Sequence, residues 1–213
     1  QCQAGVTVFL DEDKWMNPWM GSGGLQMALD DFNVETNDFA KLGFIGGATI
    51  ATASNGARPI AFRPVPPGTP SWGTEWKRAV VKHYQHTLPI NAQGGGMAYA
   101  SNYLDLDPTY RDAFGRPMLR MTFDFNENEQ RMANYANDQC ERIGKATGAK
   151  VVAKRGAPKQ YDIVPYQSTH NTGGAIMGTD PGQSALNTYL QSWDVPNVFA
   201  VGANAFPQNA GKN

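Results

Sequence analysis

The chain of 213 residues has few cysteines, and none of them has a spacing typical of metal sites. Cys2 and Cys140 are its two cysteines, and neither belongs to a Cys-x-x-Cys motif. A metal or iron–sulfur site is therefore not expected, because such sites are built from clustered thiolates or imidazoles. A Cys2–Cys140 disulfide is disfavoured, since nothing in the sequence indicates an oxidising compartment.

The chain also lacks an excess of charge and a long apolar run. Its 18 basic and 19 acidic residues give a formal net charge of −1 at pH 7. No electrostatic attraction to nucleic acid or to an anionic membrane surface is therefore expected. No apolar run approaches the roughly 18 residues that a membrane helix requires. Neither nucleic-acid binding nor a membrane span is expected for this chain.

Several catalytic motifs are missing as well. The sequence contains no Gly-x-Ser-x-Gly motif of serine hydrolases, no His-Glu-x-x-His motif of zinc proteases and no EF-hand loop. The Gly-x-Gly-x-x-Gly fingerprint that holds a dinucleotide pyrophosphate is also absent. Its nearest match, residues 21–26, lacks the third glycine. We therefore expect neither a serine hydrolase or zinc protease of these types nor a complete dinucleotide-binding unit in this chain.

The patterns that are present predict one α+β domain. A hydrophobic content of 41% in 213 residues is enough for a substantial core. Alternating runs joined by Gly and Asp turns favour a mostly antiparallel β-sheet, with helices packed on one face. Helical periodicity is found at 72–84 and 126–148, with Asn126 and Glu129 as an N-cap and N3 pair. Strands are expected at 39–53 (a strand or a bent hairpin), 96–106, 117–125 and 150–154.

The last 44 residues are the most informative part of the sequence. Residues 170–178 read HNTGGAIMG, and residues 197–203 read NVFAVGA before the chain reaches Asn213. These runs resemble the C-terminal signature of the glucose-methanol-choline (GMC) flavoprotein oxidoreductases. In that family a His-x-x-Gly-x-x-x-Met run supplies the active-site base, and a second His or Asn follows a segment ending in Val-Gly-Ala or a close variant. The order of strand, Asp-x-x-Gly-x-Pro turn, strand and long helix in residues 96–150 is similar to the sugar, polyol and gluconate dehydrogenase branch.

The resemblance implies a set of site residues and a cofactor. His170 aligns with the base and Asn213 with its hydrogen-bonding partner. FAD is the implied cofactor, with Asn171, Gly173, Gly202 and Ala203 as its contacts and no metal. Glycines lack Cβ, so the backbone at such positions can turn tightly beside a flat isoalloxazine ring.

The chemistry of alcohol oxidation explains this choice of residue types. Oxidising an alcohol to a carbonyl removes a hydride from carbon and a proton from oxygen. An imidazole suits the proton transfer, because its ordinary pKa lies near neutrality. A carboxamide can donate a hydrogen bond to the same oxygen without adding a competing charge. Read alone, a loop histidine more often has no catalytic role, so the assignment of His170 rests on the whole motif.

The resemblance further implies that the chain is the C-terminal, substrate-binding part of a longer enzyme. Residues 1–165 are expected to form the substrate-binding domain. Residues 166–213 are expected to return toward an absent FAD-binding domain through a strand at 198–202. FAD is expected in the full-length parent rather than in this chain, which alone is expected to be inactive. The implied partners are an alcohol or sugar substrate, the missing N-terminal domain and a quinone or cytochrome electron acceptor.

Two alternatives stay open from the sequence. The chain could be a non-catalytic carbohydrate-binding or inter-subunit module that retains the motif. Within the enzyme class, an oxidase that passes electrons to O₂ competes with a dehydrogenase. The resemblance is compatible with a periplasmic or membrane-associated location, and a cytoplasmic one also stays open.

Overall fold

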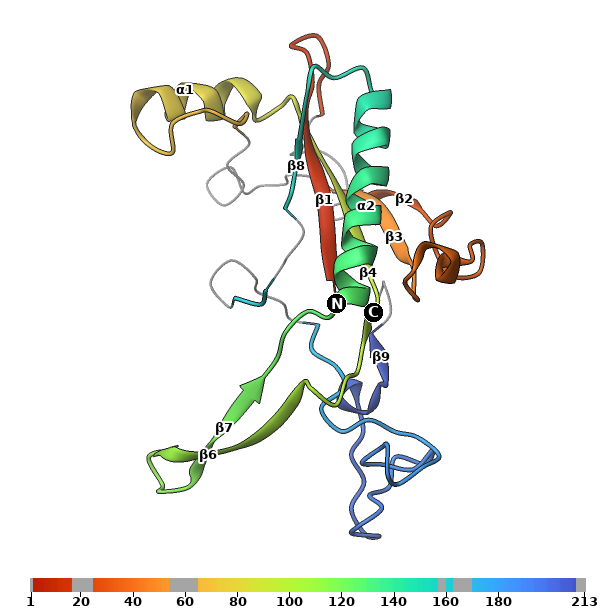
Figure 1. Cartoon of the computed structure of the whole chain (residues 1–213). Coiled ribbons are helices and arrows are strands. Elements are labelled where there is room, and N and C mark those ends of the chain that lie inside the picture. The colour runs from red at the N-terminus through yellow and green to blue at the C-terminus, as the bar shows by residue number, and fades with distance from the viewer. Residues whose placement is uncertain (1, 17–24, 54–64, 157–159, 163–169, 210–213) are drawn as a thin grey trace.

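The computed structural model describes residues 2–16, 25–53, 65–156, 160–162 and 170–209. Its centre is a five-stranded antiparallel sheet in the order β2-β3-β4-β1-β8. The α+β class expected from the sequence is confirmed (Figure 1). The strands of this sheet are β1 (Cys2–Phe9), β2 (Leu25–Leu29), β3 (Ala48–Ala53), β4 (Thr87–Gly94) and β8 (Val151–Lys154).

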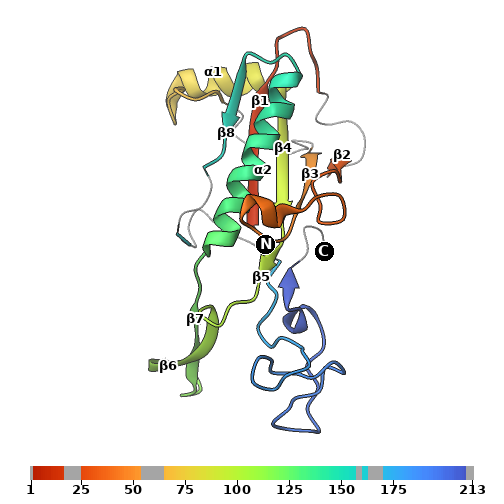
Figure 2. The same ribbon diagram turned by 45° about the vertical axis from the view of Figure 1, so that its right-hand side comes forward.

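Helix α2 (Glu127–Ala146) covers one face of this sheet (Figure 2). Its core-facing residues, such as Met132, Ala136 and Cys140, follow one another at intervals of four, which places them on one stripe of the helix. They pack on Val6, Val8, Ile50 and Ile90 of the central strands, all of which are fully buried. Cys140 is a free, buried thiol and forms no disulfide.

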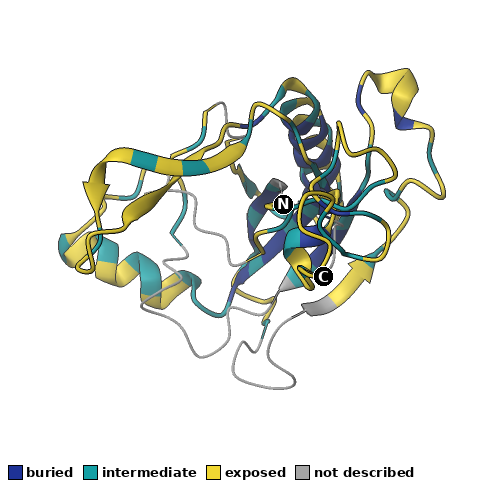
Figure 3. Ribbon diagram, turned by 90° about the horizontal axis from the view of Figure 1, so that it is seen from below, coloured by how far each residue is buried: buried dark blue, intermediate teal, exposed yellow. Residues whose placement is uncertain are grey.

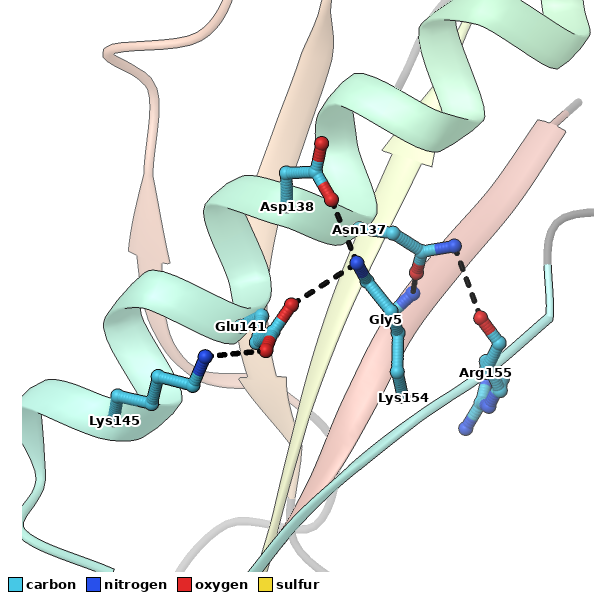
Figure 4. A network of polar contacts seen from close by, with 7 residues as sticks. All are labelled: Gly5, Asn137, Asp138, Glu141, Lys145, Lys154 and Arg155. Carbon is cyan, nitrogen blue, oxygen red and sulfur yellow. Dashed lines mark hydrogen bonds and ion pairs between the residues drawn. The ribbon is translucent and has the colours of Figure 1, made fainter.

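A polar network ties α2 to the strands beneath it (Figure 4). The Asn137 Oδ1 atom accepts a hydrogen bond from the Gly5 backbone N–H at 2.7 Å, and Nδ2 donates to the Arg155 carbonyl at 3.0 Å. Nearer the surface, the Lys154 ammonium contacts the Asp138 carboxylate at 2.6 Å. The helix is therefore held against β1 and the end of β8 by directional contacts as well as by apolar packing.

Helix α1 (Gly73–His83) has the predicted period but not the predicted packing. None of its residues is buried, and it lies beside the sheet rather than on the face that α2 covers (Figure 1). Its apolar stripe is only half-buried, with an edge-to-face contact between His83 and Phe9 at 5.4 Å. Helix α2 packs on the sheet as expected, whereas α1 has no buried residue and Trp72, at the start of its expected stripe, is exposed.

Two of the expected strands are divided in the structure. Residues 39–53 form a 3₁₀ helix η1 (Phe39–Leu42) followed by β3. Residues 96–106 form β5 (Gly96–Met97) and the start of β6 (Tyr103–Arg111), separated by a turn in which the Asn102 N–H donates to the Tyr99 carbonyl. Strand β7 (Pro117–Thr122) pairs with β6 to form a hairpin. The hairpin extends from the end of the sheet opposite to α1 and is largely exposed (Figures 1 and 3).

The C-terminal segment lies at the same end of the molecule as the hairpin (Figures 1 and 2). It is mostly irregular, with a 3₁₀ turn η2 (Ala203–Ala205) and the short strand β9 (Gln208–Asn209). The expected strand at 198–202 is reduced to one bridge between Phe199 and Gln191, because its backbone bonds locally to residues 190–192. The regular C-terminal strand is β9, which pairs with β5.

In the part of the chain that the structure describes, neither helix has the length and apolar composition needed to cross a membrane. The expected division at residues 165 and 166 falls within residues 163–169, outside the described residues, and stays a prediction.

Candidate functional site

The two C-terminal runs singled out by the sequence lie side by side. Three backbone hydrogen bonds join the first run to the end of the second and to the two residues that follow it, from Gly173 N to Ala203 O (3.2 Å), from Ala175 N to Asn204 O (2.9 Å) and from Met177 N to Ala205 O (2.9 Å). Every second N–H from Gly173 to Met177 thus donates to one of the successive carbonyls of residues 203–205. Residues separated by about thirty positions in the sequence are in this way brought into one backbone ladder.

The ladder leaves the expected cofactor contacts accessible. His170, Asn171, Gly202 and Ala203 are exposed, and Gly173 is half-buried. Gly173 has a φ of +82° and Gly202 a φ of +115°, in the region that side chains disfavour. The Gly173 N–H donates to Ala203, so the structure brings these two expected contacts together. Asn213, the expected partner of His170, lies outside the described residues.

The main chain of His170 is held from the interior. Asn209 is almost completely buried, with 1% of its surface exposed, and its Nδ2 atom donates to the His170 carbonyl at 2.8 Å. Asn209 belongs to β9 and pairs with Gly96 of β5. The backbone of the expected base is therefore connected to a strand that starts directly after β4 of the main sheet.

Sequence reasoning missed the role of Glu129 in this region. Glu129 was expected to cap the N-terminus of α2. Only 5% of its surface is exposed, and its Oε1 atom forms a hydrogen bond with β5. That oxygen accepts hydrogen bonds from the Met97 N–H at 3.2 Å and the Tyr99 hydroxyl at 2.8 Å. Burial and the hydrogen bond to Glu129 raise the pKa of the Tyr99 phenol, which keeps it protonated as a donor. The available signal was spacing, since residue 129 is in phase with Met132 and Ala136.

A cavity of about 570 Å³ opens at a different place, between the end of β1 and α1. Two ion pairs neutralise charge at its rim, Lys82 with Glu12 at 2.9 Å and Lys150 with Asp11 at 3.2 Å. Asp13 adds a third carboxylate to the lining, and no residue of the C-terminal runs lines the pocket. Its lining consists of Phe9, Leu10, Asp11, Glu12, Asp13, Pro66, Lys82, His83, His86, Lys150 and Val151.

Across the described ranges, no group of three or more His, Cys, Asp or Glu side chains is placed to hold a metal ion. The C-terminal ladder places the exposed residue His170 beside accessible backbone. Such an arrangement suits proton transfer next to a flat ligand that approaches main-chain atoms.

The sequence of the chain is similar to those of known proteins. The GMC oxidoreductase family model matches residues 98–213. The chain is 45% identical to the gluconate 2-dehydrogenase flavoprotein of Pantoea cypripedii over 98% of its own length and 34% of the relative. It is 27% identical to the 2-methyl-1,2-propanediol dehydrogenase of Mycolicibacterium austroafricanum, over 93% of its length and 35% of the relative. It is also 27% identical to the fructose dehydrogenase large subunit of Gluconobacter japonicus, over 87% of its length and 32% of the relative.

The chain thus spans about a third of the length of these curated relatives. Their names confirm the expected resemblance to the sugar, polyol and gluconate dehydrogenase branch. The matched region contains the hairpin, α2 and the whole C-terminal ladder, and it begins directly after β5. The chain belongs to the GMC oxidoreductase family.

Proposed function

We propose that this chain is the C-terminal part of an FAD-dependent dehydrogenase that oxidises an alcohol group of a sugar, a polyol or a sugar acid. The observation that carries the proposal is the ladder between the His170 run and the Ala203 run, which joins the two motif segments at one exposed surface. In this proposal residues 1–165 form the substrate-binding domain. Residues 166–213 complete the cofactor site of the longer protein.

The exposed residues of the ladder fit a flavin. When bound, FAD would supply the hydride acceptor for the alcohol, its N5 atom. The backbone around Gly173, Gly202 and Ala203 carries little or no side-chain bulk, so a flat ring can approach main-chain atoms there. Asn171, which follows the base directly, is exposed on the same run. In this proposal these four residues contact the cofactor.

His170 acts as the general base in the proposed reaction. Its exposed imidazole takes the proton from the substrate hydroxyl, for which an acceptor nitrogen must lie about 2.6–3.2 Å from the oxygen. Asn213 donates its amide N–H to the same oxygen and stabilises the negative charge that develops on it. Together the two side chains orient the alcohol so that its carbon faces the hydride acceptor.

The relatives support the proposed substrate class. Their names specify gluconate, 2-methyl-1,2-propanediol and fructose, which are polyhydroxylated acids, diols and sugars. All three are named dehydrogenases, which favours a quinone or cytochrome acceptor over O₂ for the parent of this chain. An oxidase remains the competing activity, and it is distinguished by peroxide formation in air.

The decisive experiment uses the longer flavoprotein that contains this chain. With sugars, polyols and sugar acids as donors and an artificial electron acceptor, the wild-type protein is expected to turn over and to show a flavin absorption band. His170→Ala is expected to lower kcat by about 10²–10⁴-fold, the usual contribution of a general base, with the flavin still bound. His83→Ala, a histidine at the remote cavity, is the matched control and should keep normal turnover.

Wild-type turnover in His170→Ala would contradict the assignment of the base. Binding of a sugar by the 213-residue chain without flavin, combined with no oxidation by the longer protein, would instead support a carbohydrate-binding module.

A further inference from the structure

Asn209 holds the main chain of His170 from a buried position. Its Nδ2 atom donates to the His170 carbonyl at 2.8 Å, and only 1% of Asn209 is exposed. A buried carboxamide is stable only when its polar atoms are hydrogen-bonded. The donor of this part-buried contact thus belongs to the folded interior, although His170 itself is exposed.

Strand β9, which carries Asn209, is in turn fixed by β5. Gly96 pairs with Asn209 and Met97 pairs with Gln208, and the Ala98 N–H donates to the Pro207 carbonyl at 3.2 Å. The two backbones approach closely, since a Cβ added at Gly95 would lie 2.8 Å from the Asn209 carbonyl oxygen. The position of Asn209 thus depends on the position of β5.

Strand β5 is anchored to α2 by the buried carboxylate of Glu129. Its Oε1 atom accepts a hydrogen bond from the Met97 N–H at 3.2 Å. Met97 is one of the β5 residues that pair with β9. The Tyr99 hydroxyl donates to the same oxygen at 2.8 Å. Burying a carboxylate costs much free energy unless donors compensate it, so Glu129 and its donors fix one another.

We propose that Asn209 and Glu129 are positioning residues for His170, acting through the sequence of contacts from α2 through β5 and β9 to the His170 carbonyl. The proposal rests on the proposed function, in which His170 is the base. General-base catalysis depends on sub-ångström placement, and a displacement of about 1 Å can reduce the rate about 100-fold. The contacts made by these two buried side chains fix the position of the His170 backbone relative to the folded domain.

The first test uses Asn209→Ala in the longer flavoprotein. We expect kcat to fall about 10- to 100-fold, with KM for the alcohol and the flavin absorption band nearly unchanged. Asn209→Asp, which keeps the size but replaces the donor by an acceptor, should give a similar loss. Gln208→Ala is the matched control, because Gln208 is exposed on the same strand and should keep normal turnover.

A double-mutant cycle separates positioning from a general loss of structure. In the His170→Ala background, Asn209→Ala should lower the residual turnover by no more than about twofold, because its effect passes through the missing imidazole. Equal losses in both backgrounds would overturn the proposal. Glu129 anchors β5 to α2, so Glu129→Ala should also lower turnover, as Asn209→Ala does. Glu129→Gln keeps an acceptor oxygen for Met97 and Tyr99 and should restore most of the turnover.

Hydrogen exchange distinguishes failure of this proposal from failure of the proposed function. The Gly173, Ala175 and Met177 amides donate in the ladder next to His170, so they should exchange more rapidly in Asn209→Ala than in Gln208→Ala. If His170→Ala keeps wild-type turnover, the base assignment fails, while faster exchange in Asn209→Ala would still support the positioning contact. Unchanged exchange together with unchanged turnover in Asn209→Ala would overturn the positioning proposal.

Discussion

At the scale of single residues, buried polar side chains fix the position of helix α2 relative to the sheet. Asn137 lies on α2 with 2% of its surface exposed, and its side chain bonds the Gly5 N–H and the Arg155 carbonyl (Figure 4). Its two bonds join the helix to β1 and to the end of β8. Removal of the side chain would leave two backbone groups in the interior without these partners.

The loss of these hydrogen bonds in Asn137→Ala should therefore destabilise the fold. We expect the free energy of unfolding to fall by about 1–3 kcal/mol, the usual cost of a buried polar group left without its partner. Urea denaturation followed by circular dichroism would measure it. Asn134→Ala, an exposed position one turn earlier on the same helix, is the control and should change stability by about 0.5 kcal/mol or less. Equal effects of the two substitutions would contradict the structural role of Asn137.

Cys140 should be an inert thiol. Burial raises the pKa of Cys140 to about 12, so the reactive thiolate is scarce at pH 8. In a Cys2→Ser background, a thiol reagent at pH 8 should label the native protein only slowly. Labelling should become rapid once urea unfolds it. Rapid labelling of the native protein would show that the core around Cys140 opens more readily than its complete burial indicates.

Glu129 shows where residue-level prediction reached its limit. Asn126 is the N-cap of α2 as predicted, but its side chain makes no capping bond. The carboxylate turns to Met97 and Tyr99, because the start of α2 lies against β5. A local motif predicts the helix start correctly, but it contains no information on which distant strand will need an acceptor.

At the scale of elements, the β6–β7 hairpin depends on one aspartate at its turn. The Asp112 Oδ1 atom accepts hydrogen bonds at 2.9 Å from the backbone N–H groups of Phe114 and Arg116, and Oδ2 accepts from the Arg116 Nε atom at 3.0 Å. The hydrogen bond from the Arg116 backbone is the largest of several that lower the pKa of Asp112. The carboxylate form is thus favoured in the folded turn.

The turn should consequently respond to acid. A carboxyl group whose pKa is lowered by folding stabilises the folded form at pH values above its unfolded pKa. That stabilisation is lost as the pH falls through the folded pKa. We expect the Phe114 and Arg116 amide resonances to titrate with a midpoint below that of an ordinary aspartate. Arg116→Gln, which keeps both backbone donors, should raise the midpoint slightly, whereas a midpoint at the ordinary value would argue against the capped turn.

Elements with a clear local period were predicted well. Strand β8 and helix α2 lie within two residues of the expected bounds. An amphipathic pattern marks α2 along its whole length, and β8 is a short apolar run before Lys154. The prediction of one strand at 96–106 was wrong, because the turn at Tyr99–Asn102 interrupts it. The Asn102 side chain donates a hydrogen bond to the Asp124 carbonyl and accepts one from the Asp124 N–H. The two-residue pairing of β5 with β9 joins segments more than a hundred residues apart. No local pattern could predict it.

At the scale of the whole molecule, apolar surface gathers at the end that carries the candidate site. On one face of the hairpin, Leu104 pairs with Met121 and Leu106 with Leu119, and each of these side chains is about half exposed or more. A Cβ added at Gly174 would lie 3.6 Å from the Leu104 side chain, so this face begins directly at the His170 run. In the isolated chain, another copy is the available means of covering it.

The isolated chain should therefore self-associate as its concentration rises. The double substitution Leu106→Glu with Leu119→Lys replaces two side chains that are 63% and 67% exposed by an opposite-charge pair across the strands. Sedimentation velocity should show association of the wild-type chain and a shift toward monomer in this variant. Val81→Glu removes an apolar side chain that is 80% exposed from α1, at the other end of the molecule, and should leave association unchanged. A wild-type chain that stays monomeric at every concentration would show that the hairpin face alone is too small to drive association.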